Sequence, residues 1–189
     1  MNARNWFGPI KKKGRPVWLG LGALILGGLM LTLHSYSDRI GSNPGYVSGI
    51  NYTNYYIPSF WIRFDGQKKP FVGPNVFPKE VGELRAESGG KCCVRIPADY
   101  DPERKVTVDW VSDKVVDGKT VPNRFRAAVM VPDYGDEVYG VVVHFLTEDR
   151  IRVQIVTERG VMPRIPDDDV FVRQGVLDSE PNKKAESDQ

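Results

Sequence analysis

The chain has 189 residues, with 26 Lys and Arg against 24 Asp and Glu, and two cysteines. Residues 1–37 contain five of the basic residues and none of the acidic ones, so the remainder is mildly acidic, with 21 basic against 24 acidic residues. Nucleic-acid binding requires clustered Lys and Arg, so we expect no nucleic-acid partner. The roughly 150 residues that follow residue 37 favour a single domain.

An uncharged apolar run at 17–33 divides the chain. As a helix it would reach roughly 26 Å, close to the thickness of a bilayer core of about 30 Å. All five basic residues of the N-terminal part lie in 1–16, which positive-inside orientation places in the cytoplasm. The pattern predicts a single-pass inner-membrane protein with its C-terminal domain in the periplasm. A cleaved signal peptide is the alternative.

After the apolar run, the polar residues 34–44 contain Gly41 and Pro44 and are predicted to form a tether. Residues 45–177 are the predicted β domain, because they are rich in Val, Ile, Tyr, Phe and Trp and punctuated by Gly and Pro. Residues 178–189 are charged and lack large apolar side chains, so they are predicted to be a disordered tail. The predicted strands within the domain are 45–52, 57–64, 91–96, 105–111, 124–131, 139–146 and 151–157.

Three finer expectations concern this domain. Residues 67–78, with three prolines, are predicted to form a loop, and the spacing of Val81 and Leu84 favours one or two helical turns over 80–87. The segment 139–146 is apolar on both faces and is therefore predicted to be a central strand. The fold class that follows is mainly β, a small β-sandwich or partly open barrel with one N-terminal transmembrane helix. A four-stranded sheet backed by a helix is the alternative.

The sequence offers little for catalysis. His144 is the only histidine after residue 37, and it lies between Val143 and Phe145 in an apolar strand, where a core histidine is more common than a general base. The acidic run at 167–169 lacks the spaced ligands of a calcium loop and is typical of a solvated turn. We therefore expect no catalytic residue, cofactor or metal site, and no enzyme activity.

The adjacent Cys92 and Cys93 are a candidate redox pair. Neighbouring side chains of a strand point to opposite faces, so one cysteine should be buried. Three states remain open: a strained disulfide between the two, two thiols shielded by packing, or a link to a second chain.

Aromatic side chains are dense between residues 52 and 61. Core packing is expected for Phe60 and Trp61, whereas Tyr55 and Tyr56 lie in the link between two strands. Tyr and Trp are common at the centres of protein interfaces, so Tyr55, Tyr56 and Trp61 are the candidate partner-binding residues.

Four segments together carry a family resemblance: Asn51-Tyr52-Thr53 with the residues up to Ile57, Ser88-Gly89-Gly90-Lys91-Cys92-Cys93, Val106-Thr107-Val108-Asp109-Trp110, and Val143-His144-Phe145-Leu146. In this order they resemble an uncharacterised proteobacterial family of domains of unknown function, over about residues 45–156. The resemblance implies a small exported or membrane-anchored protein. It also implies a place beside lipase effectors of the type VI secretion system, as a cognate immunity protein.

The leading functional hypothesis is therefore a membrane-anchored periplasmic binding protein that neutralises a lipase-type toxin by direct binding. Confinement at the membrane raises the local concentration of such an inhibitor where a lipase acts. The alternative is a structural or assembly component of an envelope secretion or pilus machine.

Overall fold

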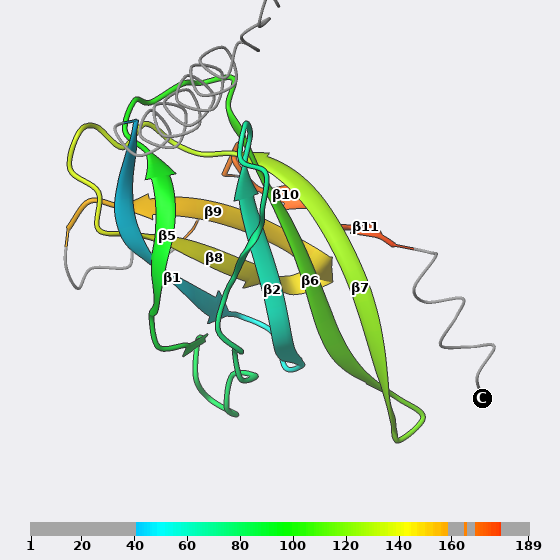
Figure 1. Ribbon diagram of the computed structural model, residues 1–189. Coiled ribbons are helices and arrows are strands. Elements are labelled where there is room, and N and C mark those ends of the chain that lie inside the picture. The colour runs from blue at the N-terminus through cyan, green and yellow to red at the C-terminus, as the bar shows by residue number, and fades with distance from the viewer. Residues whose placement is uncertain (1–40, 159–164, 166–168, 179–189) are drawn as a thin grey trace, which may run out of the picture. The chain divides into compact units, whose positions relative to one another are not determined.

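The computed structural model describes residues 41–158, 165 and 169–178 (Figure 1). The predicted cytoplasmic segment 1–16, the predicted anchor 17–33, most of the tether and the tail at 179–189 lie outside these residues. Among the residues that are described, no helix is both long and apolar enough to cross a membrane. The last residues of the predicted tether belong to the first strand, which begins at Ser42.

Two sheets make up the described domain. Sheet A has the order β10-β9-β8-β1-β4, with β5 also paired to β1, and sheet B has the order β11-β7-β6-β2-β3. The pairing of β1 with β8 is parallel, and the other pairs are antiparallel. The strands of sheet A are β1 (Ser42–Asn51), β4 (Ala86–Glu87), β5 (Lys91–Pro97), β8 (Gly140–Leu146), β9 (Arg150–Val156) and β10 (Arg173–Gln174). Those of sheet B are β2 (Tyr56–Phe64), β3 (Phe71–Val72), β6 (Lys105–Val116), β7 (Lys119–Met130) and β11 (Val176–Leu177).

The two sheets face each other across one apolar core, and Figure 1 shows β8 and β9 running across β2, β6 and β7. The mainly β prediction is confirmed for the described residues, which form two sheets that do not close into a barrel. A single 3-10 turn, Thr147–Asp149, is the helical structure found in the described part. The alternative of a sheet backed by a helix is therefore wrong for these residues.

The helical turns predicted over 80–87 are also wrong, since β4 occupies Ala86–Glu87 and the preceding residues form turns and bends. Gly82 has φ +92°, in the left-handed region that ends a helix. Val81 and Leu84 are both exposed, so the apolar spacing that suggested a helix has no core to cover.

The other strand predictions hold, with differences that tertiary pairing explains. The predicted loop at 67–78 contains β3 and an isolated bridge between Ile57 and Val76. The pairing of β2 with β6 shifts between Tyr56 and Ser59. This irregularity places Ile57 in the core with Phe60, although the simple alternation of the sequence assigns them to opposite faces.

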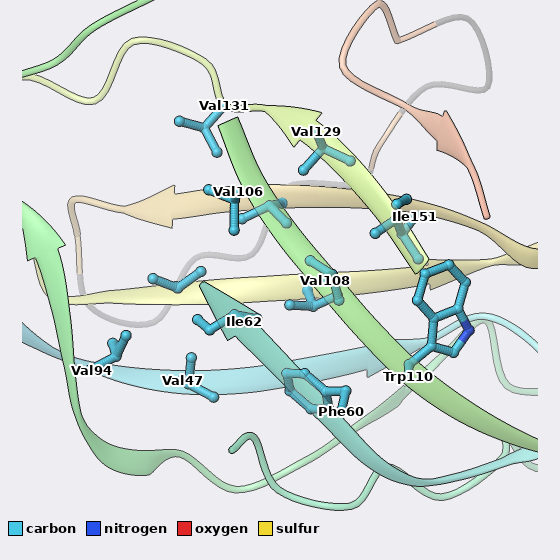
Figure 2. Close-up of a cluster of buried hydrophobic side chains, with 14 of the residues drawn as sticks. Val47, Phe60, Ile62, Val94, Val106, Val108, Trp110, Val129, Val131 and Ile151 are labelled. Carbon is cyan, nitrogen blue, oxygen red and sulfur yellow. The ribbon is translucent and has the colours of Figure 1, made fainter. Parts of the chain in front are cut away.

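Side chains from both sheets meet in the core (Figure 2). The ring of Phe60 from sheet B lies edge-on to Phe145 from sheet A at 5.3 Å between centroids, and Trp110 stacks on Phe125. Each residue from Gly140 to Phe145 is buried, which confirms that β8 is a central strand covered on both faces.

One side of the sandwich is crossed by a short segment that pairs with both sheets. Residues 173–174 pair with β9 in sheet A, and residues 176–177 pair with β7 in sheet B. Between them, the amide of Gly175 donates to the carbonyl oxygen of Asp149 at 2.9 Å. A Cβ atom at Gly175 would lie 2.8 Å from that oxygen and would collide with the ring of Trp110, so only glycine lets the chain pass here.

Gly175→Ala is therefore expected to destabilise the domain by about 1–3 kcal/mol, because the added methyl group must displace the segment or Trp110. Gly89→Ala is the matched control, since a Cβ there meets nothing within 4 Å, and its effect should stay within about 0.5 kcal/mol. Urea unfolding of the two full-length variants measures the difference. Equal stabilities would contradict the close packing of Gly175 on Trp110.

Candidate functional site

The outer face of sheet B presents aromatic and arginine side chains on neighbouring strands. On β2, β6 and β7 the inward residues belong to the core cluster, among them Ile62, Val108 and Ala127. Their neighbours along each strand therefore point outward, and none of these outward residues is buried. This surface, here called the sheet B face, is defined by Tyr56, Trp61, Arg63, Val72, Val111, Arg124, Arg126 and Val176.

Strand register places these side chains in rows. Trp61 lies beside Val72 on β3 and Asp109 on β6. The same row continues through Arg126 on β7 to Val176 on β11. Since residues directly opposite each other on a sheet share a face, Trp61 lies within a continuous row whose two ends are exposed valines.

Basic side chains on the outer side of sheet B differ in whether they form ion pairs. Arg126 pairs with Asp109 at 2.7 Å, and this carboxylate raises the pKa of the Arg126 guanidinium. The guanidinium of Arg124 lies over the ring of Trp61 at 5.3 Å. Across the part of the chain that the structure describes, Arg63, Lys105 and Arg124 form no ion pair with an acidic side chain.

Two of the three predicted partner-binding residues share this face. Tyr56 pairs with Asp113, an outward residue of β6, and its ring packs on the exposed Phe77 at 5.4 Å. Trp61 is half-exposed, so its predicted place in the core is wrong, whereas Phe60 is fully buried as predicted. The register shift between Tyr56 and Ser59 leaves Tyr56 and Trp61 on the same side.

Tyr55 lies apart from the other two candidates. Its hydroxyl donates to Asp149 Oδ1 at 3.3 Å, and Lys114 Nζ pairs with Asp149 Oδ2 at 2.6 Å. Burial, together with the nearby carboxylate of Asp149, raises the pKa of Tyr55 to about 12. Tyr55 therefore joins the β1–β2 connection to the β8–β9 turn, and we leave it out of the sheet B face.

The candidate redox pair forms a disulfide between Cys92 and Cys93 on β5. Both residues are exposed, so the expectation that one of them is buried is wrong. The peptide bond between them is cis. Tyr46 pairs with Cys92 and Gly45 with Val94, so Cys93 is an extra residue in the strand. Such a bulge breaks the strict alternation on which the expectation rested.

His144 is fully buried on the outer side of sheet A, within a chain of polar contacts. Its Nε2 lies 3.3 Å from Gln154 Oε1, an oxygen that also accepts from Arg152 Nη1. Nε2 is therefore the donor, and Nδ1 accepts from the Tyr52 hydroxyl at 3.3 Å. Arg152 in turn pairs with Asp169 at 2.9 Å. Desolvation, with a smaller contribution from the charge of Arg152, lowers the pKa of His144 to about 3.

These contacts give His144 the character of a core residue, as the sequence predicts. Both ring nitrogens are engaged and the ring is closed off from solvent, so neither nitrogen is placed to take a proton from an outside molecule. Sequence patterns do not indicate that Arg152 and Asp169 are neighbours, because the two residues meet only through the fold. Of the predicted acidic turn, Asp167 and Asp168 lie outside the described residues, while Asp169 binds Arg152 and the amide of Phe171.

Asn51 and Thr53 form a second buried polar cluster whose role the sequence did not reveal. Asn51 Nδ2 donates to the carbonyl oxygens of Tyr55 and Phe77 at 2.8 and 3.0 Å. Its Oδ1 accepts from the amide and the hydroxyl of Thr53 at 2.9 and 2.7 Å. Both donor positions and both acceptor positions of the Asn51 amide are therefore used, and they join the β1–β2 connection to the carbonyl oxygen of Phe77.

Comparison with known proteins identifies one family. The model of a family described as "Protein of unknown function (DUF3304)" matches residues 50–153, more than half of the chain. This range contains all four segments on which the resemblance to a family of unknown function rested. No curated protein and no solved structure matches the chain.

Proposed function

We propose that this chain, which belongs to the DUF3304 family, is a binding protein that captures another protein through the sheet B face. In this proposal residues 17–33 anchor it in the inner membrane and the β domain lies in the periplasm. The proposed activity needs a recognition surface and no reaction centre. The observation that carries it is the exposed row around Trp61, with Tyr56 and unpaired arginines beside it.

The composition of the sheet B face supports protein recognition. Trp, Tyr and Arg are the residues most enriched among those that dominate binding energy at interfaces. Trp61, Tyr56 and Arg124 lie together here on strands, which hold them in fixed positions. Because Arg63, Lys105 and Arg124 form no ion pair within the described residues, we propose that the complementary surface is acidic around an apolar recess that receives Trp61.

The partner we propose is a lipase-type toxin delivered by a type VI secretion system, with this chain as its immunity protein. The support is the sequence resemblance together with the predicted position at the membrane that such a toxin attacks. The alternative, a structural or assembly component of an envelope secretion or pilus machine, uses the same face for a resident partner. The identity of the captured protein separates the two.

Trp61→Ala and Arg124→Gln are each expected to weaken capture about tenfold or more, because side chains at the centre of such a face contribute about 1–2 kcal/mol or more. The native envelope is first cross-linked, and the full-length protein is then extracted from it as the bait. Quantitative mass spectrometry of the captured proteins is the measurement. Tyr46→Ala is the matched control, since this exposed tyrosine lies on sheet A.

A toxin whose capture falls in both sheet B variants and not in the control supports the immunity role. Loss of protection in growth competition against a type VI attacker, by the same two variants, is the matching cellular result. Capture of a resident machine component instead supports the alternative. Capture that is equal in all variants, with the fold intact, contradicts the sheet B face as the binding surface.

A further inference from the structure

We propose that the Cys92–Cys93 disulfide is a thiol-exchange site that reacts with small anionic thiols while the domain remains folded. The inference stands independently of the proposed function, since it concerns a different sheet. It rests on three features of β5: exposure of both sulfur-bearing residues, an open strand edge, and flanking positive charge.

Exposure comes from the place of β5 in the fold. Within the described residues β5 pairs with β1 and with no other strand, so it lies at an edge of sheet A. Cys92 and Cys93 are exposed, and so are Gly89 and Gly90 immediately before the strand. Attack on a disulfide needs access to one sulfur atom, and the two glycines before the strand add no side chain to that approach.

The bulge places the disulfide on the sheet without burying it. Two residues of β5 oppose the single residue Tyr46, while Val94 and Ile96 farther along the strand enter the core. The core contacts of β5 are therefore supplied by residues other than the cysteines. Opening the disulfide removes no buried side chain, so the sheet can retain its pairing in the reduced state.

The charge around the pair favours anionic thiols. Lys91 and Arg95 flank the cysteines on the same strand, and both are exposed. Positive charge near a cysteine stabilises the thiolate that leaves during exchange, and it also attracts a negatively charged attacking thiol. Glutathione is a thiol of this class, because its carboxylates give it a net negative charge in addition to the thiolate. 2-Mercaptoethanol has no charged group besides its thiolate.

The reaction proceeds in two balanced steps. A thiolate attacks one cysteine sulfur, a new disulfide forms to it, and the bond between Cys92 and Cys93 breaks, which leaves the other cysteine as a thiolate that takes a proton from water. A second thiolate of the same class then attacks the small-molecule sulfur of the mixed disulfide, and the bond to the cysteine breaks. That cysteine leaves as a thiolate and also takes a proton from water. The products are a Cys92–Cys93 dithiol and an oxidised disulfide of the small thiol, so two electrons pass from the thiols to the protein.

The test measures the rate at which the disulfide opens in the folded, full-length protein. At each time point an alkylating agent stops the reaction and labels the free thiols, and intact mass counts the labels. With glutathione, the rate should fall about threefold or more in the double variant Lys91→Gln/Arg95→Gln, and with 2-mercaptoethanol it should change less than about twofold. The matched control is Arg63→Gln/Lys119→Gln, which removes the same charge from sheet B. Cys92→Ser/Cys93→Ser should show no thiol-dependent mass change.

Three results would overturn the proposal. Alkylation of both cysteines before any reductant is added would show that no disulfide is present. Opening that occurs only in urea would show that thiols do not reach the pair in the folded domain. An equal decrease of the opening rate with glutathione and with 2-mercaptoethanol in the Lys91→Gln/Arg95→Gln variant would contradict the selectivity for anionic thiols.

Discussion

Asn51→Ala is expected to lower the free energy of unfolding by about 2–4 kcal/mol, because buried polar groups lose hydrogen-bond partners. The carbonyl oxygen of Phe77 loses its donor and the amide of Thr53 loses its acceptor, while the Tyr55 carbonyl oxygen and the Thr53 hydroxyl keep the 3.3 Å contact between them. Asn51 is completely buried, so water does not readily replace these bonds. Urea unfolding of the full-length protein, followed by tryptophan fluorescence, measures the loss.

Two further variants isolate the cause. Asn54→Ala, an exposed residue of the same turn, is the matched control and should change stability by less than about 0.5 kcal/mol. Asn51→Asp keeps the shape of the side chain but turns both donated bonds into contacts between oxygens and buries a charge, so it should destabilise at least as much as alanine. A stability of Asn51→Asp close to that of the unchanged protein would contradict the hydrogen-bonding role.

Acidification from pH 7.5 to pH 5 is expected to cost about 2 kcal/mol of stability through His144 alone, at about 1.4 kcal/mol per pH unit below 6.5. The folded state holds the pKa of His144 near 3, whereas an unfolded chain titrates near its ordinary value of about 6.5. Between these two values the unfolded state binds one more proton. Stability is therefore complete above about pH 6.5 and falls as the pH drops toward 3.

The control for this prediction is a variant in which the change of the unfolding free energy with pH is measured, and not the free energy at a single pH. His144→Gln retains a donor and an acceptor for Tyr52 and Gln154 but has no proton to bind in this range, so its stability should change much less between pH 7.5 and 5. NMR of the unchanged protein should show ring signals of His144 that do not titrate over the same interval. An equal slope in the variant, or a titrating ring, would contradict the buried neutral state.

These two predictions assign fold-forming roles to residues from two of the segments that carry the family resemblance. Asn51 begins the first of these segments, and His144 is the one histidine of the described domain. The parallel pairing of β1 with β8 places Ile50 opposite His144 and Asn51 opposite Phe145. Two of the four segments that carry the family resemblance are thus neighbouring strands of one sheet, joined by the contact between Tyr52 and His144.

Composition and alternation were sufficient to predict the mainly β class and most strand positions. Alternation at Val106, Val108 and Trp110 predicts the buried face of β6, and the two-sided apolar run at 139–146 predicts the central place of β8. Both inferences succeed because burial of apolar side chains is the dominant favourable contribution to folding and has a fixed period of two residues in a strand.

Which exposed residues share a surface, and which polar residues contact each other, depends on the tertiary structure. The register shift in β2 places Tyr56 with Trp61 and sends Tyr55 to Asp149, and the bulge in β5 exposes both cysteines. Such irregularities depend on how partner strands pair, and partners here are separated by tens of residues. A periodic pattern in one segment cannot specify them, so the sheet B face and the exposed disulfide appear only once the strands are assembled.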